Sequence, residues 1–78
     1  MTVVLYGRPD CHLCDEARSM LVRADVAFTE RDIEADDELF KRYLERIPVI
    51  VVDGEEAFDL VIDEERLRAR LGVDAGNS

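Results

Sequence analysis

Two short apolar runs place the strongest limit on how this chain folds. Val3–Tyr6 reads VVLY, and Val49–Val52 reads VIVV. A run of four apolar residues without polar alternation is typical of a strand that is buried on both faces. The chain has 78 residues, which is enough for one small domain. We therefore expect a single sheet that contains these two strands, with helices covering both of its faces.

The segment after the first run shows the pattern of an amphipathic helix. Asp10 is a suitable N-cap, and the helix is predicted from His12 to Ala24. Apolar residues along this segment return at helical spacing and form one stripe that faces the core: Leu13, Ala17, Met20, Leu21 and Ala24.

Capping residues mark two further helices. Asp36 can cap a helix over Asp37–Glu45, and Pro48 prevents this helix from continuing. Asp63 can cap a last helix, and Gly72 ends it.

The remaining segments complete a mixed sheet. Val26–Ile33 alternates polar residues and suits an edge strand, and Asp53-Gly54 is a type I′ hairpin signal that leads into an antiparallel strand over Glu56–Leu60. The predicted order is β-α-β-α-β-β-α, an α/β fold with a four-stranded mixed sheet and helices on both faces. We expect one domain over residues 1–72 and a frayed tail over residues 73–78.

The chain contains two cysteines, and both lie in the stretch GRPDCHLCDE. Cys11 is predicted at the end of a central strand and the start of a helix, where backbone N–H groups and the helix dipole favour a thiolate. Cys14 lies one turn further on the same side, so the two sulfurs can meet. Arg8 favours the Cys11 thiolate and the nearby acids oppose it, so we expect the pKa of the Cys11 thiol to be modestly lowered. Cys11 is then the attacking thiolate, and Cys14 resolves the mixed disulfide.

Other uses of the cysteine pair fit less well. A bridge across so short a loop contributes only about 2 kcal/mol by loop entropy and joins no distant segments. For zinc, Cys11, His12 and Cys14 supply at most three ligands, which leaves a zinc ion shared across a dimer as an alternative. A covalent c-type haem needs histidine directly after the second cysteine, where Asp15 stands. A redox-inert binding module or a metal carrier is the rival from another functional class.

The charge of the chain argues against nucleic acid and anionic membranes. The net charge is −9, from 19 acidic and 10 basic residues, so few cations are left to neutralise phosphates.

We see no secretory signal and no stretch long enough to span a bilayer, and we expect a monomer in the cytoplasm, where thiols stay reduced.

Two long stretches of the chain resemble glutaredoxins. VVLYGRPDCHLCDEARSML resembles their active-site unit, with a strand, a Gly-Arg pair and C-x-x-C at the start of a helix. ERDIEADDELFKRYLERIPVIVVDGEE resembles the rest of the fold, including the proline before the third strand. The motif Cys-His-Leu-Cys most resembles that of small glutaredoxin-like proteins. The resemblance implies a thioredoxin-like fold and thiol–disulfide oxidoreductase activity on protein or small disulfides, with a redox-active Cys11–Cys14 disulfide and no other cofactor.

The resemblance also implies roles for residues around the cysteines. Pro48 would be a cis-proline that faces the pair, and Ile47 would offer backbone groups to an extended substrate. The alternative for Pro48 is a trans proline that begins a strand. Arg8 can fix an anionic substrate group or balance local acids, and His12 can tune the thiol, contact substrate or be solvated.

One stretch departs from the glutathione-using members of the family. They usually carry Gly-Gly after the fourth strand and acidic residues at the last helix, whereas this chain reads AFDLVIDEER there. Asp63 and Glu64 could mimic the acidic part, but the glycines are absent. Glutathione is therefore doubtful as the reductant, and a thioredoxin-type reductase is the alternative.

Overall fold

The computed structural model describes residues 1–73 and confirms the predicted order of elements. A short 3-10 turn over Ile33–Ala35 precedes the second α-helix. The helices and strands, in chain order, are β1 (Val3–Gly7), α1 (His12–Arg23), β2 (Thr29–Asp32), α2 (Asp37–Tyr43), β3 (Val49–Val52), β4 (Glu55–Asp59) and α3 (Glu64–Leu71).

The four strands form one mixed sheet in the order β2-β1-β3-β4. β1 pairs parallel with β2 and antiparallel with β3, and β3 pairs antiparallel with β4. The two apolar runs are therefore the central strands, and β2 is an edge strand, as predicted. Asp53 and Gly54 have φ values of 51° and 82°, the two positive φ angles that the predicted type I′ turn requires.

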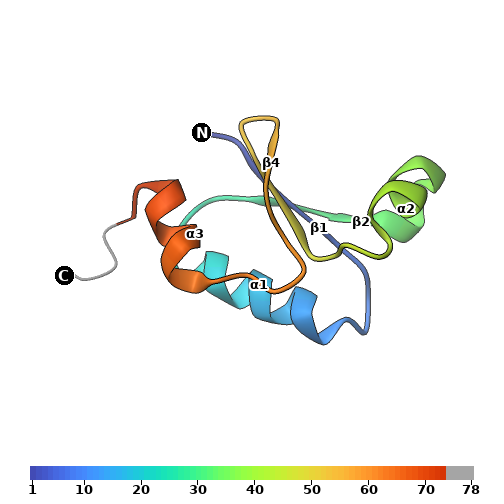
Figure 1. Cartoon of the computed structure of the whole chain (residues 1–78), viewed down its shortest axis with the longest axis horizontal. Helices are drawn as coiled ribbons and strands as arrows, with labels where there is room; N and C mark the ends of the chain where they lie inside the picture. The colour runs from blue at the N-terminus through green and yellow to red at the C-terminus, as the bar shows by residue number, and fades with distance from the viewer. Residues whose placement is uncertain (74–78) are drawn as a thin grey trace.

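Helices cover both faces of the sheet, and each face has its own apolar cluster. Figure 1 shows α1 and α3 together on one side of the strands and α2 apart from them, near the end of β2. Because side chains alternate along a strand, Leu5 packs toward α1 and α3, whereas Tyr6 packs toward α2. The first cluster has the fully buried Leu21, Ile50, Val52 and Leu67 at its centre. The second is built on Ile33, Tyr43 and Val49.

Several predicted boundaries differ from the structure by one to three residues, and three of these differences have a clear local reason. β2 begins at Thr29 rather than Val26, because the backbone at Val26 still donates a hydrogen bond to the end of α1. α2 ends at Tyr43 rather than Glu45, where a tighter turn takes over. β4 ends at Asp59 because Leu60 has a left-handed backbone, with φ of 61°.

The carboxyl end of α3 extends the packed region by one residue beyond the predicted domain. Gly72 has the left-handed conformation, with φ of 76°, that commonly ends a helix. The Val73 N–H donates to the Arg68 carbonyl at 2.9 Å, and the Val73 side chain packs against the first apolar cluster. The other residues of the predicted tail, 74–78, lie outside the described part of the chain. Within residues 1–73, no helix combines the length and the apolar character needed to cross a membrane.

Candidate active site

The cysteine pair lies where the chain leaves β1 and enters α1. Cys11 is the N-cap of α1, and its Sγ accepts a hydrogen bond from the Cys14 N–H at 3.2 Å. The prediction of Asp10 as the cap is wrong. Asp10 has a left-handed φ of 61°, which turns the chain one residue before the helix and leaves the extended cap position to Cys11. A backbone N–H that points at the sulfur favours its anionic form, because the charged acceptor makes the stronger hydrogen bond.

The two sulfurs are bonded to each other but differ in exposure. Cys11 and Cys14 form a disulfide, with their Cα atoms 5.2 Å apart. Cys14 is fully buried, whereas Cys11 is only partly buried. An incoming reactant can therefore approach Cys11, while Cys14 is reached from within the protein.

Gly7, the last residue of β1, makes room for the buried cysteine. A Cβ atom at this position would lie 3.0 Å from the Cys14 Sγ and 3.2 Å from the Cys14 Cβ. Both distances are shorter than an ordinary van der Waals contact. The sequence placed Gly7 only as the end of a strand and as part of the resemblance, and its spatial relation to Cys14 depends on how α1 packs on β1.

We expect Gly7→Ala to destabilise the reduced protein by about 1–3 kcal/mol, since an added methyl group in a filled site forces buried neighbours to move. Urea denaturation with a reductant present measures this change. Repeating the substitution in a Cys14→Ala background removes the sulfur that the methyl group meets, so the cost should shrink there. An equal cost in both backgrounds would show that the sulfur is not the obstacle.

Two side chains near Cys11, those of Arg8 and His12, each lie against a carboxylate. The Arg8 Nη2 lies 2.6 Å from a carboxylate oxygen of Glu34, and the His12 Nε2 lies 2.9 Å from one of Glu16. His12 is 84% exposed. No local sequence signal predicts the Arg8–Glu34 pair, because the 3-10 turn that carries Glu34 joins the site only through the packing of the sheet. The structure thus brings Arg8 to the site with its charge matched by an acid.

Ile47 lines a cavity together with Cys11, and the resemblance implies a cis-proline at the next residue. The Ile47–Pro48 peptide bond is cis, and the Pro48 side chain is fully buried. A cavity of about 500 Å³ next to Cys11 is lined by both Cys11 and Ile47, together with Arg8, Pro9, Asp10 and Glu34. The Ile47 N–H donates to the Tyr43 carbonyl at 3.0 Å, so this donor is used inside the protein. The substrate contacts assigned to Ile47, Pro48, Arg8 and His12 stay predictions.

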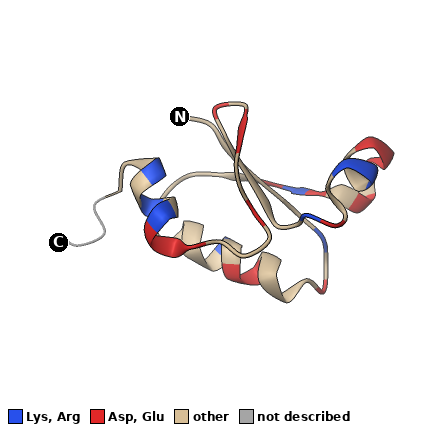
Figure 2. Ribbon diagram, in the orientation of Figure 1, with Lys and Arg blue, Asp and Glu red and all other residues tan. Residues whose placement is uncertain are grey.

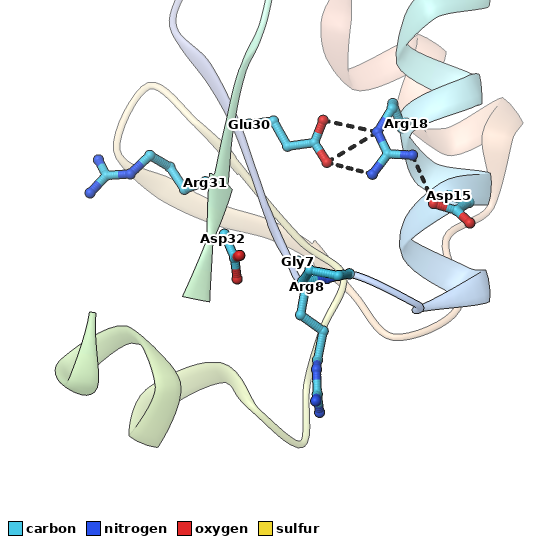
Figure 3. A pocket seen from close by; sticks show the side chains of 8 residues that line it. Gly7, Arg8, Asp15, Arg18, Glu30, Arg31 and Asp32 are labelled. Atoms are coloured by element: carbon cyan, nitrogen blue, oxygen red, sulfur yellow. Dashed lines mark hydrogen bonds and ion pairs between the residues drawn. The ribbon is translucent and has the colours of Figure 1, made fainter. Parts of the chain in front are cut away.

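A second cavity, of about 390 Å³, lies on the β2 side of the same loop (Figure 3). The Arg18 guanidinium crosses it and bonds to Glu30 and Asp15. These hydrogen bonds, with Glu30 contributing most, raise the pKa of Arg18 further above its usual value. Acidic and basic residues alternate along the β2 edge of this cavity (Figure 2), and two of the acids that line it, Glu30 and Asp15, are paired with Arg18. Among residues 1–73, no three His, Cys, Asp or Glu side chains converge as a metal site.

A match between the sequence and a family model identifies the family of this chain. The model of the glutaredoxin-like domain (DUF836) matches residues 2–72. The chain belongs to this glutaredoxin-like family. A comparison with curated proteins found no match to the sequence.

Solved structures agree with the family assignment. A structural-genomics target from X. campestris is 38% identical with a TM-score of 0.81, and the match covers 94% of this chain and 99% of that one. A point mutant of a thioredoxin-like protein is 27% identical with a TM-score of 0.75, over 94% of this chain and 97% of that one. A glutaredoxin from Archaeoglobus fulgidus, at 23% identity, has a TM-score of 0.68 over 88% and 84% of the two chains and shows the shared fold. This glutaredoxin-like protein therefore has the thioredoxin-like α/β fold that the sequence predicted.

Proposed function

We propose that this glutaredoxin-like protein is a dithiol oxidoreductase that reduces disulfides through Cys11 and Cys14. The observation that carries the proposal is the asymmetry of the pair. Cys11 is accessible at the start of a helix and accepts the Cys14 N–H, whereas Cys14 is fully buried within disulfide reach of it. A nucleophilic thiol and a protected resolving thiol need these two environments.

The reaction follows from thiol–disulfide exchange and transfers two electrons to the substrate. The Cys11 thiolate attacks one sulfur of the substrate disulfide, a mixed disulfide forms, and the other substrate sulfur leaves as a thiolate that takes up a proton. Cys14 then loses its proton and attacks the Cys11 sulfur, so the second substrate thiolate leaves and the Cys11–Cys14 disulfide remains. An external thiol donor must reduce this disulfide before the next turnover.

We further propose a thioredoxin-type reductase, rather than glutathione, as the electron donor. In the stretch where glutathione-using relatives carry glycines, Leu60 and Val61 project side chains that are 46% and 80% exposed. Asp63 caps α3 by accepting from two backbone N–H groups, and Glu64 is paired with Arg23. The acids that could hold a glutathione backbone are therefore engaged within the protein. A location in the reducing cytoplasm fits the Cys11–Cys14 pair, because the disulfide must be reduced after each turnover.

The proposal is tested with the wild-type protein in a disulfide-reduction assay. With dithiothreitol as donor and insulin as substrate, we expect insulin reduction well above the rate with dithiothreitol alone. Replacing the donor with glutathione and its reductase should give little turnover, while a thioredoxin reductase should support it. A rate equal to background with every donor would favour the redox-inert binding module, and metal analysis of protein purified without chelator would then test a metal carrier.

A further inference from the structure

Glu34 neutralises an arginine in the wall of the cavity beside Cys11. Of the described residues that line this cavity, Arg8 is basic, and Asp10 and Glu34 are acidic. The Arg8 and Glu34 side chains, paired at 2.6 Å, are 40% and 39% exposed. Figure 3 shows the Arg8 side chain directed away from Arg18, so Arg8 is not part of the Arg18 network. The Arg8–Glu34 pair therefore belongs to the Cys11 cavity and is open to solvent.

Asp10 adds a second carboxylate to the same wall. It directly precedes Cys11, and its side chain is exposed. Within residues 1–73, its carboxylate forms no ion pair. Aspartate and glutamate side chains are ionised near neutral pH. Because one arginine shares the wall with two carboxylates, the charge beside Cys11 is negative.

The other charges near the cysteine pair do not reverse this sign. The His12–Glu16 pair is neutral when the imidazole is protonated and negative when it is not. The guanidinium of Arg18 is already held by two acids. The start of α1 contributes roughly half a positive charge, which offsets less than one carboxylate. The chain as a whole carries a net charge of −9, so the surroundings add to the negative potential.

The pairing with Glu34 decides what Arg8 can offer a substrate. An exposed guanidinium without a partner holds a carboxylate well, because its planar N–H groups fit the two oxygens. In this cavity an anionic substrate group must displace Glu34 and also approach Asp10. A cationic group meets attraction instead. Complementary charge speeds association, and like charge slows it.

We propose that Glu34 is a specificity-determining residue: by neutralising Arg8 beside Cys11, it makes the site select disulfides flanked by cationic groups over disulfides flanked by anionic ones. This inference rests on the proposed function and adds the class of substrate. In a polypeptide the cationic groups are lysine or arginine side chains next to the cystine, and in a small disulfide they are amines. The exchange reaction itself is unchanged.

The test uses peptides with one disulfide that differ only in the residue beside each cysteine, which is lysine, glutamine or glutamate. Reduced protein is mixed with excess peptide, the reaction is stopped by alkylation, and the remaining protein thiols are counted by intact mass. This gives a second-order rate constant for each peptide without an electron donor. Dividing the lysine and glutamate rate constants by the glutamine one removes any change in the reactivity of the Cys11 thiol, which releasing Arg8 from Glu34 would alter.

For wild type, the lysine ratio should lie above, and the glutamate ratio below, the ratios that the neutral dithiol dithiothreitol gives with the same peptides. Glu34→Gln should lower the lysine ratio and raise the glutamate ratio, each about two- to fivefold at low salt, the effect of two unit charges about 8 Å apart at an exposed site. Arg8→Gln should move both ratios in the opposite direction. At about 1 M salt, the wild-type preference should shrink, because the Debye length falls to about 3 Å.

Glu65→Gln is the matched control. It removes the same charge from an exposed position on α3, next to the glutamate that pairs with Arg23 in the last turn of α1. Both ratios should stay at their wild-type values in this variant. Cystamine and bis(2-hydroxyethyl) disulfide, one cationic and one neutral, separate the sources of the cation. Glu34→Gln lowers their rate ratio if any nearby amine is selected, and leaves it unchanged if the selected cation is a polypeptide side chain.

The inference is overturned if Glu34→Gln shifts the peptide ratios by less than about twofold at low salt, if Arg8→Gln does not shift them the other way, or if Glu65→Gln shifts them as much as Glu34→Gln. A wild type whose thiols react with none of the disulfides would refute the proposed function itself. That outcome is distinct from a wild type that reacts with all of them at the ratios of dithiothreitol, which would refute the charge selection alone.

Discussion

Cys11→Ser is expected to reduce insulin at the rate of dithiothreitol alone, a complete loss of the catalysed reaction. A serine hydroxyl stays protonated near neutral pH and does not attack a disulfide, and the buried Cys14 cannot meet the substrate in its place. The substitution should leave the fold intact. The serine oxygen can accept the hydrogen bond that the Cys14 N–H now donates to the Cys11 Sγ, and serine is a favoured N-cap residue.

Two controls make the loss in Cys11→Ser specific. Val22→Ser changes a side chain of α1 that is 62% exposed and lies eleven residues beyond Cys11, and it should keep full activity. Under reducing conditions, Cys11→Ser and wild type should unfold at the same urea concentration, whereas oxidised wild type gains up to about 2 kcal/mol from closing its short loop. Activity that survives in Cys11→Ser would remove Cys11 from the mechanism.

Local sequence signals predicted most of the fold, because they act within a few residues. The two apolar runs became the central strands, and Asp53-Gly54 became the tight turn between β3 and β4. Asp36 and Asp63 cap α2 and α3 by accepting backbone N–H groups from the first helical turn, as their positions indicated. In each case the feature depends on the backbone preferences of a short segment.

The helix that carries the cysteines shows where such signals stop. Asp10 and Cys11 are neighbours, and aspartate is the better N-cap by general preference. Cys11 is the N-cap because the chain that leaves Gly7 turns at Asp10 with a positive φ, so that Cys11 has the extended backbone of a cap residue. That path depends on how α1 packs across the sheet, and no single segment specifies it.

The contacts of Arg46, the residue before Ile47, depend on the register of the strands, which the sequence alone does not specify. Arg46 meets Glu56 and Asp59 because the pairing of β3 with β4 shifts between Ile50 and Val51. A shift of one residue reverses which side chains share a face. The cysteine pair itself could be predicted because both members lie in one turn of helix, whereas the contacts of Arg46 with Glu56 and Asp59 join segments that meet only in the folded sheet.

Cys14→Ser is expected to stop turnover and to trap the substrate on Cys11. The first exchange needs only the Cys11 thiolate, so a mixed disulfide forms, but no second thiol is left to displace it. A peptide that contains one disulfide should therefore give a one-to-one adduct by intact mass, which dithiothreitol reverses. Wild type under the same conditions should show little adduct, because Cys14 lies within disulfide reach of Cys11.

The trapping result has its own controls, since the site of Cys14 is fully buried. A buried serine hydroxyl without a partner costs about 1–3 kcal/mol, and Cys14→Ala, which adds no polar atom, should trap the same adduct in a more stable protein. The double variant with serine at both positions has no thiol and should form none. If the adduct forms equally in wild type, or if Cys14→Ala continues to turn over, release does not run through Cys14, and the buried sulfur has a structural role instead. If the adduct accumulates only when Cys14 is absent, the difference in burial between the two sulfurs matches the division of their chemistry: the partly buried Cys11 sulfur takes the substrate and the fully buried Cys14 sulfur releases it.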